Sequence, residues 1–419
     1  MAAAPSLHEL EFLDPGVFAR EGYPHDVWTR LRAEDPVHWY DRSPGEKFWT
    51  ITRHEDIVFI GKRPDLFISD PVLVVQPTPL AERDDSFPKN LIQFDPPKHG
   101  QQRKLISKGF TPRALRRFHP DIERIARGVV DDLFAEGERG ECDFVDRISA
   151  PLPIAVIGWL LGVPEPDWPK LYHWTNRILG SSDPEFRDED STMETVRKAQ
   201  EELFSYFADL VAKKRANPED DLVTLFAHAE VEGEKLSDME VLIWCNLIVA
   251  AGNETTRNAT SGGMAALIEH PKELRKLQRA IADGDEGLLK RGVEEILRWT
   301  SPIIQFARTA TQDVELRGRQ IKKGDIVALY YPSANRDEAV FEAPFEFRVD
   351  RTPNRHLAFG IGEHFCAGAH VARLEIEYAL RFFLPRLEEI ELAGPIDRLH
   401  SSFIGGIKRL PIRYKLRPA

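Results

Sequence analysis

The stretch Phe359-Gly360-Ile361-Gly362-Glu363-His364-Phe365-Cys366-Ala367-Gly368 decides how the chain is interpreted. It presents one cysteine in a loop interrupted by glycines, directly before a segment of helical period. Gly360 and Gly362 allow a tight backbone path that a residue with a Cβ would resist, and Gly368 leaves room for a flat cofactor. Backbone N–H groups after Cys366 would point at the sulfur and stabilise its negative charge. Taken alone, the cysteine would be interpreted as a buried free thiol; the surrounding pattern favours a metal ligand.

From Phe359 to Arg373 this pattern resembles the cytochrome P450 signature, in which Phe, two Gly, a basic residue, Cys and Gly recur at the same spacing. The resemblance implies that Cys366 is the proximal thiolate ligand of a haem b iron. It also implies that His364 hydrogen-bonds a haem propionate, and that the loop residues Phe359, Gly360 and Gly368 contact the haem. Ala367 replaces the larger aliphatic residue that is common there, which leaves the ligand assignment unchanged.

Composition excludes several other classes of protein. The chain has 419 residues and a formal net charge of −12, which argues against nucleic acid as a partner. Its three cysteines, Cys142, Cys245 and Cys366, show no spacing of a disulfide framework or a zinc ribbon. The N-terminus lacks a signal peptide pattern, and the best apolar run, Val241 to Ala251, is too short to cross a bilayer. We expect a cytoplasmic protein without membrane insertion.

The coarse pattern of the chain is helical. Two patches favour strands: residues 37–52, with a turn at Ser43-Pro44-Gly45, and residues 314–331. Most other segments have helical period, including Val371 to Leu384 after the cysteine loop. We therefore predict a mainly α (α+β) fold with small antiparallel sheets. In line with the resemblance, we expect one catalytic domain over residues 1–419, without a fused reductase, acting as a monomer.

A second motif lies in a predicted helix that Ser237 and Glu240 open as a capping box. In it, Thr255 can bond the carbonyl of Ala251, which bends a helix. From the residues alone, a polar helix end facing solvent is an equally good interpretation.

Residues 251–255, Ala-Gly-Asn-Glu-Thr, are similar to the P450 oxygen-binding motif. This implies that Ala251 lies beside the haem, that Thr255 hydrogen-bonds O2 and that Glu254 relays protons. Relatives driven by peroxide tend to lack this pair, so a monooxygenase is favoured. Peroxide-driven oxidation and a non-catalytic haem-thiolate sensor or carrier stay open.

Charged pairs suggest how the scaffold and the haem are held. Glu295 and Arg298 could be an ordinary surface pair, but their position between the two motifs fits the P450 ExxR pair, which Arg351 would complete. His99 and Arg103, four residues apart, share one helix face. The family uses such a pair for the haem propionates, and Arg308 would join them.

Electrons must come from elsewhere, since the chain carries no flavin or iron–sulfur module. A basic stretch stands out in this acidic protein, and it could be a solvated surface or a docking site for an acidic ferredoxin. Through this ferredoxin and its reductase, NAD(P)H would be the indirect electron donor. The stretch comprises Lys98, Lys104, Lys108, Arg113, Arg116 and Arg117.

The substrate is less well specified. Apolar residues at family-typical pocket positions imply a small lipophilic substrate, although each could be ordinary core. The candidate wall residues are Ile92, Ile248, Ile304 and Phe403, with Val249, Ile303, Phe306 and Ile404 beside them.

A finer resemblance concerns substrate class. Residues 250–258, 320–324, 333–335 and 405–408 look like those of bacterial P450s that oxidise sterol side chains and methyl-branched lipids. Terpene-hydroxylating relatives share some of these features, and the cysteine loop departs from the pattern of the sterol enzymes. We expect a steroid, a terpenoid or a branched lipid as the substrate.

Overall fold

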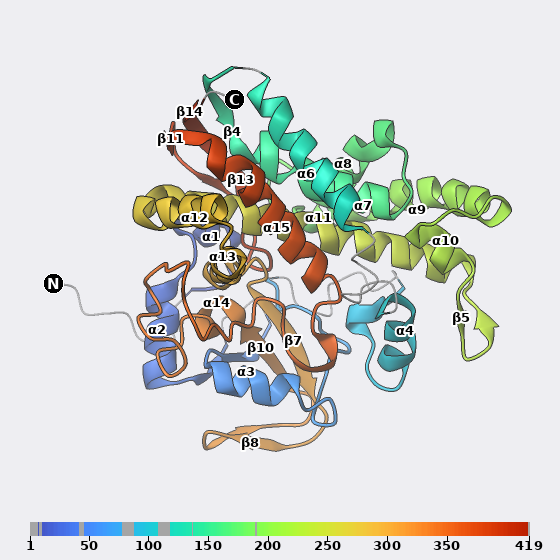
Figure 1. Ribbon diagram of the computed structural model, residues 1–419. Helices are drawn as coiled ribbons and strands as arrows, with labels where there is room; N and C mark the ends of the chain where they lie inside the picture. Colours follow the sequence, from blue (N-terminus) through green and yellow to red (C-terminus); the bar gives the residue numbers. More distant parts are fainter. Residues whose placement is uncertain are drawn as a thin grey trace.

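The computed structural model of the chain describes residue 7 and residues 11–41, 46–77, 88–107, 118–135, 137–188 and 191–417. Its longest helix is α11 (Asp238–Glu269), which runs through the middle of the molecule (Figure 1). The predicted capping box opens it: Ser237 Oγ accepts from the Glu240 N–H at 3.3 Å, and the Glu240 carboxylate accepts from the Ser237 N–H at 2.9 Å. Apolar residues cover nearly all of its faces, so the helix is buried along most of its length.

Helices surround α11, and α7, α8, α9, α13 and α15 pack against it. The α-helices are α1 (Pro15–Glu21), α2 (His25–Glu34), α3 (His54–Gly61), α4 (Lys98–Ser107), α6 (His119–Phe134), α7 (Pro151–Leu160), α8 (Trp168–Leu179), α9 (Thr192–Ala216), α10 (Leu222–Ala227), α11, α12 (Pro271–Asp283), α13 (Glu286–Thr300), α14 (Tyr331–Ala334) and α15 (Ala369–Phe383). Short 3-10 turns include η3 (Leu91–Gln93) and η6 (Gly362–His364).

A mixed sheet forms the other side of the molecule, where β7 and β10 lie below α11 in Figure 1. Its order is β1-β2-β10-β7-β3, and β10 runs parallel to β2 while the other pairs are antiparallel. The prediction of small antiparallel sheets therefore needs one correction, at this pair. The strands of this sheet are β1 (Val37–Tyr40), β2 (Phe48–Ile51), β3 (Phe67–Ile68), β7 (Gln305–Ala310) and β10 (Ile326–Tyr330).

The remaining sheets are small and antiparallel, in the order β11-β14-β4 for three strands and β5-β6, β8-β9 and β12-β13 for pairs. Their strands are β4 (Arg139–Asp143), β5 (Glu230–Val231), β6 (Glu234–Lys235), β8 (Val314–Leu316), β9 (Arg319–Ile321), β11 (Leu387–Leu392), β12 (Asp397–Arg398), β13 (Ile407–Arg409) and β14 (Pro411–Leu416).

The predicted elements agree with the observed ones. Both strand patches form strands, the segment after Cys366 forms α15, and the mainly helical class is confirmed. The turn predicted at residues 43–45 lies outside the described residues. Among the helices of the described ranges, none is long and apolar enough to cross a membrane.

Two apolar cores meet at α11. One joins the N-terminal half of α11 to α7, α8 and α9, and the other joins its C-terminal half to α12, α13 and α15. Near this junction α15 follows the cysteine loop directly, so the loop is brought close to the middle of α11.

Candidate haem-thiolate site

The cysteine loop is held by backbone hydrogen bonds and by glycine conformations. The Cys366 N–H donates to the Phe359 carbonyl at 2.9 Å. Gly362 has a φ of +77°, and a Cβ there would lie 1.8 Å from the carbonyl oxygen of Gly61 at the end of α3. Only glycine allows both this conformation and this approach. The loop is thus fixed between α3 and α15.

Burial of the Cys366 sulfur is opposed by the charges and backbone dipoles around it. Burial raises the pKa of the Cys366 thiol, while the Gly368 N–H, Arg103 and Arg373 act to lower it. The side chain is accessible from the adjoining cavity although it lies deep among protein atoms. Within the described ranges, no group of three or more His, Cys, Asp or Glu residues is arranged to hold a metal ion.

A cavity of ≈ 390 Å³ separates the cysteine loop from α11. Almost every site residue predicted from the sequence lines it, although these residues come from positions 92 to 403. The predicted residues in its wall are Ile92, His99, Arg103, Ile248, Ala251, Thr255, Arg308, Phe359, Gly360, His364, Cys366, Gly368 and Phe403.

Ile304 is an exception and corrects one prediction. Its side chain is fully buried in the core that includes Phe12 and Trp28, under the mixed sheet. Its neighbour Ile303, which bridges to Ile404, lines the cavity instead. Adjacent side chains of an extended segment point to opposite faces. Ile303 therefore faces the cavity, and Ile304, which was predicted to do so, faces the core.

Val249 is likewise buried in the core and does not line the cavity. Glu254 also lies outside the cavity wall. Its carboxylate pairs with Arg257 and accepts a hydrogen bond from the Asn258 amide at 3.2 Å. Arg257 also donates to Asn176 of α8 at 2.8 Å. The Glu254 Oε2 atom and the Arg257 Nε atom have no hydrogen-bond partner within the described protein. Glu254 therefore belongs to a buried polar cluster behind the α11 face that meets the cavity.

Thr255, in contrast, faces the cavity. Its hydroxyl donates to the Ala251 carbonyl at 2.9 Å, as its spacing predicts. At Gly252 a Cβ would lie 2.4 Å from Ile157 Cδ1 of α7, so this glycine allows α7 and α11 to pack closely. The neighbouring acid and hydroxyl of this motif thus lie on two sides of one helix.

Four basic side chains gather at the edge of the cavity. The rings of His99 and His364 have centroids 4.2 Å apart, and Arg103 and Arg308 line the same space. Arg308 is buried and makes no ion pair with any carboxylate in the described part of the chain; its Nη1 donates to the Ala307 carbonyl at 2.6 Å. The Nε2 atom of His99 is buried and has no hydrogen-bond partner among the residues that the structure describes.

Among these groups, the buried Arg308 guanidinium needs an anionic partner. Burial lowers the pKa of Arg308 and, together with the charges of Arg308, His99 and Arg103, lowers the pKa of His364 to about 3. A buried guanidinium without a counter-ion is costly. A dianionic, planar cofactor with a metal toward Cys366 would satisfy this set, so the residues fit the haem that the sequence resemblance implies.

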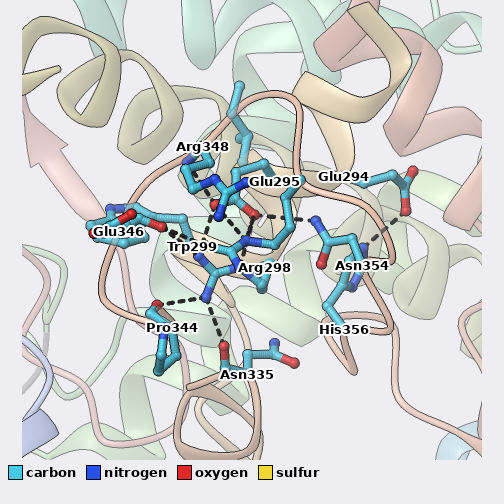
Figure 2. Close-up of polar contacts among 12 residues, drawn as sticks. Glu294, Glu295, Arg298, Trp299, Asn335, Pro344, Glu346, Arg348, Asn354 and His356 are labelled. Atoms are coloured by element: carbon cyan, nitrogen blue, oxygen red, sulfur yellow. Dashed lines mark hydrogen bonds and ion pairs between the residues drawn. The ribbon is translucent and has the colours of Figure 1, made fainter. Parts of the chain in front are cut away.

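The loop before Cys366 is organised by a fully buried ion pair (Figure 2). Arg298 donates to both carboxylate oxygens of Glu295 at 2.8 Å, and to the carbonyls of Asn335 and Pro344 at 2.9 Å. Arg351 donates to the same carboxylate at 3.1 Å, as predicted. This network fixes the segment that leads from β10 to the cysteine loop.

Sequence reasoning missed a second carboxylate in this region. Glu294 accepts from His356 and from Arg373, which stand on the two sides of the cysteine loop (Figure 2 shows Glu294 and His356). The sequence did contain a signal for this carboxylate, because Glu294 directly precedes Glu295 and the basic residues His356 and Arg373 flank the cysteine loop.

The predicted basic stretch is described only in part. Lys98 and Lys104 are exposed on α4, whereas Lys108, Arg113, Arg116 and Arg117 lie outside the described residues. Arg103 of the same helix donates to the carbonyls of Glu363 and Phe365 in the cysteine loop. Helix α4 therefore contacts this loop through Arg103.

Comparisons with known proteins agree with this geometry. The sequence model of the family described as Cytochrome P450 matches residues 37–416. The steroid C26-monooxygenase of Mycolicibacterium smegmatis is 36% identical over 418 residues, covering 97% of this chain and 94% of that protein. The methyl-branched lipid omega-hydroxylase of Mycobacterium bovis is 37% identical over 397 residues, covering 93% and 90%.

A solved structure has the same fold. A cytochrome P450 from Mycobacterium marinum in complex with pseudoionone superposes with a TM-score of 0.89 at 32% sequence identity, covering 98% of this chain and 100% of that chain.

Proposed function

This chain belongs to the cytochrome P450 family and is a monooxygenase, and we propose that it hydroxylates a steroid, a terpenoid or a methyl-branched lipid. The apolar cavity between Cys366 and Thr255 carries the proposal. Its wall includes Ile92, Ile248 and Phe403, and a cavity of this kind selects lipophilic molecules by shape and desolvation. The substrates that the names of two relatives give, steroids and methyl-branched lipids, are of the same class.

In this proposal the chain holds haem through two sets of residues. Cys366 provides the thiolate ligand, and the Gly368 N–H helps to keep its sulfur ionised. His99, Arg103, Arg308 and His364 bind the propionates. When bound, the thiolate-ligated haem iron supplies the O2-dependent oxidation of a C–H bond.

The residues of α11 would manage protons. Thr255 is placed to donate its hydroxyl hydrogen bond into the cavity after releasing the Ala251 carbonyl. Glu254 lies one residue away but on the side of Arg257 and Asn258. A carboxylate held in this way can pass protons only by rotating or through water, so its pairing with Arg257 would control when protons reach Thr255.

Electrons would come from NAD(P)H through a reductase and an acidic ferredoxin. Lys104 supports a docking site on the outer side of α4, since that helix contacts the cysteine loop through Arg103. The exposed ring of Phe365 offers an apolar contact in the same place. Electrostatic steering to such a surface is sensitive to salt.

An optical titration of the purified ferric haem protein tests the substrate class. The panel is a 3-oxo sterol, a monoterpene alcohol and a branched fatty acid. We expect a saturable shift of the Soret band to shorter wavelength with at least one of them, followed by a hydroxylated product in the presence of O2, NAD(P)H, ferredoxin and reductase. Absence of a shift and of a product with every compound would contradict the proposed substrate class.

A further inference from the structure

Two carboxamides stand out in the wall of the cavity. Gln200 of α9 and Asn246 of α11 both line it. The Oε1 atom of Gln200 and the Oδ1 atom of Asn246 are buried, and neither has a hydrogen-bond partner in the described parts of the protein. Buried polar atoms are nearly always paired, because leaving them unpaired costs the desolvation of the group. Both unpaired atoms are oxygens, which accept hydrogen bonds, and they therefore indicate a ligand group in the cavity that donates one.

The surroundings of these amides specify a neutral group. From α8, Ile178 and Leu179 line the cavity, and Leu247 and Ala250 line it beside Asn246 on α11. Among the described residues of α8 and α9 that line the cavity, none is charged. An ionised headgroup would have no counter-charge here, and burying it unpaired would be costly. A carboxamide can donate to a carbonyl or hydroxyl oxygen and can accept from a hydroxyl.

The position along α11 separates this part of the cavity from the cysteine. Asn246 precedes Thr255 by nine residues, which corresponds to about 13 Å along a helix axis at the rise of an α-helix. That length is comparable with the long dimension of a steroid ring system. A ligand whose oxygen is held near Asn246 would place its opposite, apolar end toward Thr255 and Cys366.

We propose that Gln200 and Asn246 bind a neutral hydroxyl group at one end of the lipophilic substrate, which donates its hydrogen to one of the two unpaired amide oxygens. By holding this end they select which remote carbon lies beside Cys366. The inference rests on the proposed function, because it specifies one end of the substrate proposed there.

Three forms of one skeleton test this recognition: the alcohol, the ketone and the compound without oxygen, built on the panel compound that gives the largest Soret shift. We expect wild type to bind the alcohol at least about tenfold more tightly than the ketone or the deoxy compound, as the loss of one or two hydrogen bonds predicts, because only the alcohol can donate to an amide oxygen. In the Gln200→Leu, Asn246→Leu double variant this ratio should fall close to one, while the affinity for the deoxy compound is retained. Gln320→Leu, the same change at an exposed position of β9, should keep the wild-type ratio.

Wild type alone provides a second measurement. The alcohol should be hydroxylated at one main position and the deoxy compound at several. Equal product distributions, or a double variant with the wild-type affinity ratio, would overturn the proposal. If the three forms bind wild type equally, only this inference fails; if no panel skeleton binds, the proposed function fails with it.

Discussion

The guanidinium of Arg373 donates two hydrogen bonds to the carboxylate of Glu294, at 2.6 and 3.0 Å, and so ties α15 to α13 behind the cysteine loop. His356 bonds the same carboxylate at 2.9 Å from the other side of the loop. Arg373 also lies over the ring of Phe359, 4.5 Å from its centroid. One carboxylate therefore fixes both ends of the segment that presents Cys366.

This carboxylate should make stability depend on acid. Burial alone would raise the pKa of Glu294, but the hydrogen bonds from His356 and Arg373 lower it from 4.5 to about 2. The ionised form thus favours the folded state. Its contribution, about 3 kcal/mol by linkage, is complete above about pH 4.5 and is lost as the pH falls through 2.

We therefore expect Glu294→Gln to lower the free energy of unfolding at neutral pH, and its difference from wild type to shrink as the pH falls below about 4.5. Urea unfolding of both proteins at several pH values measures this. Glu389→Gln, at an exposed carboxylate of β11, is the control and should follow wild type. A constant difference between Glu294→Gln and wild type at all pH values would contradict the prediction.

The buried Glu295–Arg298 pair should matter more for folding than for chemistry. Removing one partner leaves the other charge buried and unpaired, which costs about 3–5 kcal/mol. We expect Glu295→Gln to give little folded holoprotein, because Arg298 and Arg351 would both lose their carboxylate.

Arg298→Lys is the informative comparison, since it keeps the charge but loses the planar fork that bonds both oxygens. It should be destabilised relative to wild type and also yield less haem-loaded protein. Wild-type stability in urea for this variant would show that charge alone suffices, contrary to the bidentate geometry.

Arg308 should govern haem retention. It is buried and without a carboxylate partner in the ranges that the structure describes, so a haem propionate would be its counter-ion. We expect Arg308→Gln to release haem about 10- to 100-fold faster, corresponding to a lost charged hydrogen bond. Transfer of haem to apomyoglobin measures the rate. Arg319→Gln, at an exposed position of β9, should release haem like wild type, and an unchanged rate for Arg308→Gln would argue against the propionate assignment.

Local signals in the sequence predicted most of the site because its parts are short motifs. The capping box of Ser237, the hydroxyl bond of Thr255 and the pairing of Arg298 with Glu295 each depend on residues a few positions apart. The prediction for Ile304 was wrong because the side chain that faces the cavity is determined by the pairing of residue 303 with residue 404. This pairing is a long-range contact.

Other features depend on packing that no local pattern encodes. Glu254 pairs with Arg257, which in turn donates to Asn176 of α8. Gln200 and Asn246 line the same cavity because α9 packs on α11. The parallel pairing of β10 with β2 joins segments that are far apart in the chain.

Thr255 offers the sharpest test of monooxygenation. Thr255→Val keeps the shape of the side chain but removes its hydroxyl group. In the wild type this hydroxyl donates to the Ala251 carbonyl and could turn to donate into the cavity. Without this donor, reduced O2 should be released as hydrogen peroxide, because the protons that the monooxygenase reaction needs are not delivered to it. We expect NAD(P)H oxidation to continue while product per NAD(P)H falls at least about tenfold, a conservative bound because a positioned proton donor typically contributes about 100-fold or more. Thr260→Val is a matched control, because Thr260 makes the same type of bond, to the Thr256 carbonyl at 2.8 Å, but does not line the cavity. Full coupling in Thr255→Val would exclude this hydroxyl from proton delivery, whereas equal losses in both variants would assign the effect to the bending of α11.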